Sequence, residues 1–161
     1  MKLLAFNGTD FDNLYDFMTP LWHDTYGKIL PREQIELLLD KYFSPEGIAH
    51  FRELGYQYYK LDDGKTVGVV VIAEKNGSTY LDKLYLLPES RGKGYAAFVF
   101  GALLDMGRDI TLNVNQGNAR ALACYKKNGF IIESEERIEL GGGMVNIDYN
   151  MRLTRENFKK K

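Results

Sequence analysis

The middle of the chain holds the feature that most constrains its fold, a run of strand patterns joined by tight turns. Gln57–Leu61, Thr66–Glu74 and Ser78–Leu87 are rich in β-branched and aromatic residues. The second turn is Asn76-Gly77, a dipeptide that two-residue hairpin loops favour. Thr66–Glu74 is largely Val and Ile, which predicts a strand buried on both faces. Together these patterns predict an antiparallel meander.

Helical patterns lie before and after the meander. Apolar residues recur at three- and four-residue spacing over Leu14–Tyr26, and Pro20 is expected to kink or split this helix. A second helix is expected to begin at Pro31, and a short third helix to cover Ile48–Leu54. The elements expected after the meander are a helix over Tyr95–Met106, a strand over Ile110–Val114, a helix from the cap Asn118 to Asn128-Gly129, and a hairpin of Phe130–Ile138 and Met144–Leu153.

These elements predict a single mixed α/β domain over residues 1–161, because a chain of 161 residues suits one domain. Within it we expect a helical region over residues 1–55, a core over 56–130 and a closing hairpin over 131–153. The lysine tail 159–161 is expected to be a solvated end. Exposed strands in the final hairpin would allow pairing across a two-fold axis, so a homodimer is left open.

Composition excludes several classes of function. Lys and Arg number 21 against 22 Asp and Glu, and this net charge of −1 argues against a dominant basic surface for nucleic acid. No stretch approaches the roughly 20 apolar residues of a membrane-spanning helix, so no membrane role is expected. Cys124 is the single cysteine, which excludes an internal disulfide and a cysteine cluster for a metal. The first residues lack a secretory pattern, so a cytoplasmic location is expected.

The loop Pro88–Ala96 is the most informative motif. Gly92 and Gly94 allow a tight backbone with uncovered amides just before a helix, and Arg91 and Lys93 add positive charge, which suits a phosphate or pyrophosphate. The alternative is a plain glycine-rich turn with solvated charges. A P-loop is excluded, because the Gly-Lys pair is followed by Gly rather than Ser or Thr. A dinucleotide fingerprint fits poorly, since the preceding strands form a meander.

Two motifs in this order resemble the GNAT family of N-acetyltransferases. The family's motif Arg/Gln-x-x-Gly-x-Gly/Ala stands here as Arg91-x-x-Gly94-x-Ala96, after a strand that ends at Pro88. Its second motif is matched by Leu112-Asn113-Val114, Asn118-x-x-Ala121 and the run Tyr125–Phe130. The clear match covers Thr66–Phe130. The resemblance implies a GNAT-like fold, with a central, mostly antiparallel sheet of six to seven strands flanked by four to five helices.

The resemblance also implies acetyl-coenzyme A as the donor and assigns roles to matching residues. It implies that the main chain at Leu84, Tyr85 and Leu86 pairs with the pantetheine arm, and that Asn118 contacts the coenzyme. It implies that Tyr125 acts as general acid beside the coenzyme sulfur. The pyrophosphate would be held by the loop of Arg91, Gly92, Lys93, Gly94, Tyr95 and Ala96.

The residues themselves are compatible with these roles. Asn118 and Tyr125 are seven positions apart, so they share a helix face about 10 Å apart along the axis. A phenol with a pKa near 10 can protonate a departing thiolate. The alternatives are a core aromatic at Tyr125 and a plain helix cap at Asn118. Cys124 is interpreted as a packing residue rather than a nucleophile, because no base adjoins it in the sequence.

The residue that accepts the amine's proton is the open question. Some family members place a Glu on one of the two strands that flank the cleft. Here the strand expected over Ile110–Val114 carries Asn113 rather than Glu. The strand expected over Ser78–Leu87 carries Asp82, which we predict as the base. The alternative is a solvated Asp82 or one that pairs with Lys83 or Arg108. His23, Asp24 and Tyr26 lie on the first helix, where the family's acceptor often binds.

Three functions are weighed. The first is an N-acetyltransferase that acts by direct attack in a ternary complex on a primary amine of a small molecule, such as a polyamine, an amino acid or a related metabolite. The second is a protein acetyltransferase for N-termini or lysines. The third is an acyl-CoA-binding regulator without catalysis. Neither a metal nor nucleic acid enters any of them.

Overall fold

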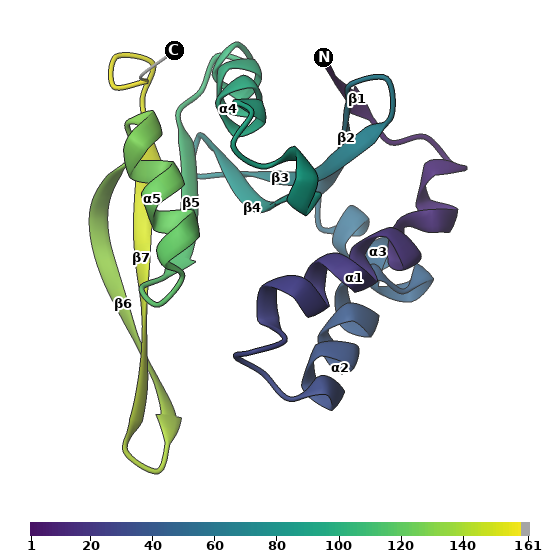
Figure 1. The fold of residues 1–161 in the computed structure, drawn as a ribbon. Helices are drawn as coiled ribbons and strands as arrows, with labels where there is room; N and C mark the ends of the chain where they lie inside the picture. The colour runs from purple at the N-terminus through teal and green to yellow at the C-terminus, as the bar shows by residue number, and fades with distance from the viewer. Residues whose placement is uncertain (159–161) are drawn as a thin grey trace. The chain divides into compact units, whose positions relative to one another are not determined.

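The computed structural model describes residues 1–158, and its strands form one seven-stranded sheet in the order β1-β2-β3-β4-β5-β7-β6 (Figure 1). The predicted mixed α/β fold is confirmed. The lysine tail expected to be solvated lies outside the described residues. The strands are β1 Lys2–Ala5, β2 Gln57–Asp62, β3 Thr66–Lys75, β4 Ser78–Leu86, β5 Ile110–Asn115, β6 Ile131–Gly141 and β7 Met144–Leu153. The helices are α1 Leu14–Tyr26, α2 Arg32–Phe43, α3 Pro45–Glu53, α4 Tyr95–Leu104 and α5 Ala119–Asn128, with short 3-10 turns at Asp10–Asn13 and Pro88–Ser90.

The sheet is mixed, and the parallel pair of β4 and β5 marks a crossover of the chain. β4 pairs with β5 in parallel at Thr79↔Ile110 and Tyr80↔Thr111. β1 runs antiparallel to β2, and β7 runs antiparallel to both β5 and β6. A parallel pair needs a long connection, and here the connection contains helix α4.

The chain divides into two compact units. The first contains Met1–Val71 and Lys83–Arg91, and the second contains Ile72–Asp82 and the chain from Gly92 on. The boundary therefore passes through β3 and β4. The single domain expected from the sequence stays a prediction.

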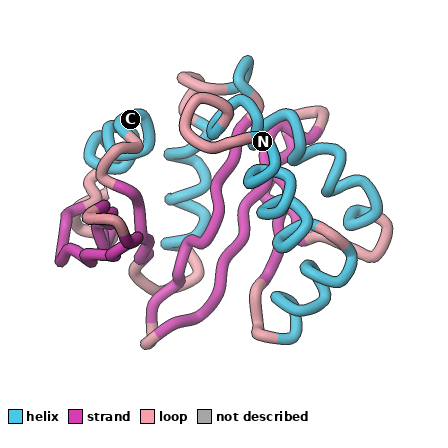
Figure 2. The backbone as a smooth tube through the Cα atoms, turned by 90° about the horizontal axis from the view of Figure 1, so that it is seen from below, coloured by secondary structure: helices cyan, strands magenta, loops and turns pink. Residues whose placement is uncertain are grey.

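Helices α1, α2 and α3 of the first unit pack beside one another (Figures 1 and 2). Their apolar faces share one core with Val69 and Val71 of β3. As predicted, β3 is buried on both faces, since its residues from Val67 to Ala73 are all buried. The helix residues of this core are Leu14, Met18, Leu21, Trp22, Ile35, Leu39, Phe43 and Ile48.

The first 55 residues differ from the sequence expectation in three places. Lys2–Ala5 form a strand rather than helix or coil, because they pair with β2 in the register Lys2↔Asp62. Helix α1 is continuous through Pro20, so the expected split does not occur. Helix α3 begins at Pro45, earlier than expected, because the Ser44 hydroxyl accepts a hydrogen bond from the Gly47 amide and caps the helix.

The second unit packs helices α4 and α5 through an aromatic cluster. The Phe100 ring lies 6.1 Å from Tyr125 and 5.0 Å from Phe130, measured between centroids. β6 is an edge strand of the sheet, and Ile131, 50% exposed, lies on it. Pairing of this edge with a second copy stays a prediction. Among residues 1–158, every helix is too short or too polar to cross a lipid bilayer.

Candidate active site

The loop before helix α4 takes a backbone conformation that glycine alone adopts readily. Gly92 has φ +75° and Gly94 has φ +83°, both in the left-handed region. A Cβ added at either glycine would meet nothing within 4 Å, so conformation rather than space demands glycine here. Gly92, Lys93 and Gly94 are exposed. Their backbone is therefore accessible to a ligand.

The N-terminus of α4 follows directly and adds the positive end of its dipole. Gly94 is the N-cap residue, and within residues 1–158 no side chain caps this end of the helix. Tyr95 and Ala96 open the first turn and are half-buried. Amides at an uncapped helix start, preceded by two left-handed glycines, suit an anion such as pyrophosphate. The predicted coenzyme therefore fits this loop.

Strand β4 carries the segment predicted to pair with pantetheine, Leu84–Leu86, and a glycine of β3 lets it approach closely. A Cβ added at Gly68 would lie 2.7 Å from the Tyr85 carbonyl oxygen and 2.8 Å from Leu86 Cδ2. The Leu87 amide donates to the Val67 carbonyl at 2.9 Å. Glycine within a strand often marks such a close backbone approach.

Two polar contacts join helix α1 to the segment Lys83–Arg91 within the first unit. The Arg91 guanidinium donates from Nη1 to Asp24 Oδ2 at 3.1 Å. The hydroxyl oxygens of Tyr26 and Tyr85 lie 3.0 Å apart. Arg91, predicted as a coenzyme ligand, therefore already has an acidic partner on α1.

Asn118 caps helix α5, and Tyr125 lies within it, as predicted. The Asn118 side chain accepts a hydrogen bond from the Ala121 amide at 3.3 Å, so its role as helix cap is real. Tyr125 is half-buried, and its ring lies 5.3 Å from that of Phe130. Gly129 ends the helix with φ +107°, and the Phe130 amide donates back to the Tyr125 carbonyl. Tyr125 thus sits in an ordered turn with its ring partly in the core.

Cys124 has the environment of a packing residue. Burial raises the pKa of its thiol, against a smaller lowering by the Lys127 ammonium. The raised pKa keeps the thiol protonated near neutral pH, and a thiol is a weak nucleophile. This supports the interpretation made from the sequence.

The predicted base Asp82 lies half-buried on β4, in the second unit. Of the two cations weighed as its partners, Arg108 forms an ion pair with Glu74 at 3.0 Å. Lys83 places its ammonium 4.2 Å from the centre of the Tyr42 ring. Asn113 is exposed on β5, opposite Asn150 of β7. The role of Asp82 stays a prediction.

Sequence reasoning missed the aromatic cluster around Tyr85. The Trp22 ring lies 4.8 Å from that of Tyr26 and 5.9 Å from that of Tyr85. The spacing of Trp22 and Tyr26, one helical turn, was visible in the sequence. Tyr85 comes 59 residues after Tyr26, and no local pattern signals that contact.

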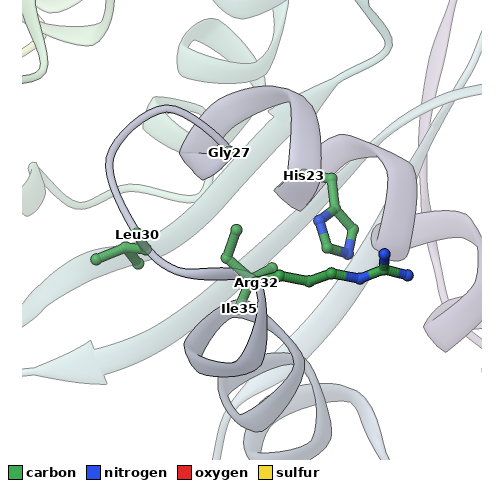
Figure 3. A pocket seen from close by; sticks show the side chains of 5 residues that line it. All are labelled: His23, Gly27, Leu30, Arg32 and Ile35. Carbon is green, nitrogen blue, oxygen red and sulfur yellow. The ribbon is translucent and has the colours of Figure 1, made fainter.

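A separate pocket lies where α1 ends and α2 begins. It has a volume of about 270 Å³ and is lined by His23, Gly27, Leu30, Arg32 and Ile35. Figure 3 shows the His23 ring and the Arg32 side chain next to each other at this pocket. Arg32 also pairs with Glu36 at 3.1 Å. In the described part of the chain, no three His, Cys, Asp or Glu side chains gather as metal ligands would.

Comparisons with known proteins agree with the fold and the motifs. A family model described as "Acetyltransferase (GNAT) family" matches residues 12–130. An uncharacterized N-acetyltransferase of Mycobacterium tuberculosis, Rv2669, is 38% identical over 95 residues, which are 55% of this chain and 60% of that protein. The peptidyl-lysine N-acetyltransferase YjaB of Salmonella typhimurium is 27% identical over 78 residues, 48% of this chain and 51% of YjaB. The matches thus span less than two thirds of each of these relatives.

Two solved structures show the same fold over nearly the whole chain. PaiA N-acetyltransferase from Thermoplasma acidophilum, in complex with coenzyme A, has a TM-score of 0.71 at 22% identity, covering 96% of this chain and 99% of PaiA. Spermidine N-acetyltransferase from Vibrio cholerae, in complex with CoA and spermine, has a TM-score of 0.66 at 21% identity. That match covers 97% of this chain and 96% of the enzyme.

Proposed function

Since this chain belongs to the GNAT family of acetyltransferases, we propose that it transfers an acetyl group from acetyl-coenzyme A to a primary amine of a small molecule. The acceptor classes are a polyamine, an amino acid or a related metabolite. One observation carries the proposal: two left-handed glycines lead into an uncapped helix α4, in the strand–loop–helix context of the family motif.

The donor is held by main-chain groups more than by side chains. The amides from Gly92 to Ala96 bind the pyrophosphate, and Arg91 and Lys93 supply positive charge. The main chain of Leu84–Leu86 pairs with the pantetheine arm as a neighbouring strand would. Asn118 caps α5 and contacts the coenzyme as well. Acetyl-coenzyme A, when bound, supplies an acetyl group activated as a thioester.

The transfer is direct. The neutral amine nitrogen attacks the thioester carbonyl carbon, a C–N bond forms, and the C–S bond breaks. The Tyr125 hydroxyl gives its proton to the departing sulfur, and Asp82, directly or through water, accepts the proton that the nitrogen loses. An acyl-enzyme on Cys124 is disfavoured, because the raised pKa of its thiol leaves little thiolate.

A peptidyl-lysine acceptor is the second candidate, since YjaB, which bears that description, is among the relatives. A small amine is preferred because the rings of Trp22, Tyr26 and Tyr85 lie together near the end of α1, and aromatic rings suit a cationic amine. A regulator without catalysis would bind the coenzyme and transfer nothing.

Release of free thiol from acetyl-coenzyme A tests the proposal, over a panel of polyamines, amino acids and lysine peptides. We expect release with small amines and a fall in turnover of about 10²-fold in Tyr125→Phe, with coenzyme affinity little changed. Tyr59→Phe is the matched control, because this exposed hydroxyl bonds only to Gln57 Oε1 among the described residues. Turnover of Tyr125→Phe within twofold of the parent would refute the general-acid role. Tight coenzyme binding without release from any acceptor would favour the regulator.

A further inference from the structure

Another pocket lies within the first unit, lined from strands β1 and β2 and from the end of helix α3. It has a volume of about 420 Å³, and the residues that line it include Phe6, Phe11, Arg52, Tyr56 and Tyr58. Phe6 follows β1, Tyr58 lies on β2, and Arg52 lies in the last turn of α3. Ligand pockets of proteins commonly measure about 300–1,000 Å³, so this one is large enough for a small molecule.

Three of the aromatic rings at this pocket pack against one another. The ring centroids of Phe6 and Phe11 are 5.0 Å apart, and those of Phe11 and Tyr58 are 5.5 Å apart with their planes at 75°. Tyr58 is buried, whereas Phe6 and Phe11 are half-buried, so both phenylalanines leave ring surface accessible. An aromatic ligand that covered this surface would bury apolar area and add ring–ring contacts.

Arg52 supplies the charge of the pocket. Among the described residues, it is the one charged side chain in the lining. Its guanidinium carbon lies over the Phe11 ring, 4.4 Å from the ring centre. An arginine that packs on an aromatic ring keeps N–H donors for a carboxylate, which it can bind through two parallel hydrogen bonds. The pocket thus combines an aromatic surface with an anion-binding group.

The guanidinium of Arg52 forms no ion pair with a carboxylate of residues 1–158. Asp10, which precedes Phe11 in the chain, accepts a hydrogen bond from the Asn7 amide at 2.9 Å and pairs with Lys60 at 2.8 Å. This acid is therefore already engaged. The positive charge over the Phe11 ring remains available to an anion from solution.

We propose that this pocket binds a small aromatic carboxylate, with its ring against Phe6 and Phe11 and its carboxylate on Arg52. Charge decides between classes of ligand here, because the guanidinium attracts an anion and repels a cationic amine. The occupant is therefore not the acetyl acceptor. The inference is independent of the proposed function, since no residue in the lining is assigned to the coenzyme or to proton transfer. We expect the aromatic acid and coenzyme A to bind without competing.

Calorimetric titration with three probes separates the contributions of ring and charge. Indole-3-acetate carries both groups, tryptophol keeps the indole ring and replaces the carboxylate by an alcohol, and acetate lacks the ring. In the parent we expect indole-3-acetate to bind with a dissociation constant of about 1 mM or lower. Tryptophol should bind about two- to fivefold more weakly, and acetate without measurable affinity. Saturating coenzyme A should leave these affinities unchanged.

Two variants assign these contributions to residues. Arg52→Gln should weaken indole-3-acetate about two- to fivefold and leave tryptophol unchanged, because only the carboxylate uses the guanidinium. Phe11→Leu should weaken both indoles about two- to tenfold, because both use the ring. Arg32→Gln is the matched control, since it removes an exposed arginine of α2 in the same unit, and it should bind both indoles as the parent does. Circular dichroism checks that each variant is folded; if Phe11→Leu is not, the comparison of Arg52→Gln with Arg32→Gln decides alone.

Amide chemical shifts of isotope-labelled protein locate the bound ligand. Indole-3-acetate should shift the amide resonances of Phe6, Phe11 and Tyr58, and Arg52→Gln should reduce these shifts at equal ligand concentration. The inference is overturned if the parent does not bind indole-3-acetate, if Arg52→Gln and Arg32→Gln weaken it equally, or if coenzyme A displaces it. Release of thiol from acetyl-coenzyme A is measured separately, so any of these results leaves the proposed function standing wherever acetyl transfer is observed.

Discussion

Replacing Gly68 by Ala tests whether the close approach of β3 and β4 shapes the donor site. The added Cβ would lie 2.7 Å from the Tyr85 carbonyl oxygen, and real Cβ atoms essentially never approach within 3.0 Å. The methyl of Leu86, at 2.8 Å, is the far end of a flexible side chain and can rotate away. The carbonyl belongs to the backbone, so β4 itself must move.

The size of the effect follows from two opposing terms. Inserting a methyl into a packed site costs about 1–3 kcal/mol. Alanine recovers about 0.4–1 kcal/mol by restricting the unfolded chain. With central values of about 2 and 0.7 kcal/mol, the net loss is about 1 kcal/mol, which should lower Tm by about 2–4 °C in a chain of this size. A shifted β4 also loses one or two main-chain bonds to pantetheine, and coenzyme affinity should fall about 5- to 30-fold.

Thermal and urea denaturation, both monitored by circular dichroism, measure the stability of the variant. Calorimetric titration with coenzyme A measures its affinity. Gly101→Ala is the matched control, because among residues 1–158 the added Cβ would meet the Phe158 ring alone, at an ordinary 3.5 Å. The double variant Gly68→Ala/Leu86→Val removes part of the side-chain contact and leaves the contact with the carbonyl. If that variant recovers the parent's affinity, the backbone explanation is wrong. Parent-like stability and affinity in Gly68→Ala alone would refute the whole argument.

Three further predictions concern single residues. Gly94→Val should weaken coenzyme binding by at least tenfold, because a β-branched residue resists φ +83°. If titration shows that a folded Gly94→Val protein binds coenzyme A as tightly as the parent, the proposed pyrophosphate loop is wrong. Asn118→Asp should keep the helix cap and parent stability, whereas Asn118→Ala should lose about 1 kcal/mol in urea denaturation. The hydrogen bond from the Asn7 amide, and then that from Lys60, hold the pKa of Asp10 below its ordinary value. The ionised carboxylate therefore stabilises the fold above about pH 4, and this stabilisation is lost as the pH falls through the lowered pKa. Thermal melts between pH 3 and 7 should show Asp10→Asn less stable than the parent near neutrality and the gap closing below about pH 4; a constant gap refutes this.

Local sequence patterns predicted most helices, strands and turns, because these depend mainly on residues within a few positions of one another. Asn76-Gly77 specified its hairpin, and the nearly continuous Val and Ile of residues 66–74 specified a strand buried on both faces. The glycines at 92, 94 and 129 have the left-handed φ values that such positions require. The same reading missed β1, because four residues carry no usable periodicity and only pairing with β2 makes them a strand. The sequence also predicted that Pro20 would kink or split α1; the helix is continuous through Pro20, and Met18, Leu21 and Trp22 on either side of it pack in the core.

The sequence by itself determined the fold class and the order of the motifs along the chain. Each depends on the spacing of residues within short segments, and that spacing can be read directly from the sequence. Tertiary structure alone decided that Arg91 meets Asp24, that Tyr85 meets Tyr26 and that Gly68 lies under the Tyr85 carbonyl. These pairs are separated by many residues, and their contact depends on how helices pack on strands. The order of apolar and polar residues along the chain does not specify which side chains meet, because many side chains of similar size and polarity would give the same order.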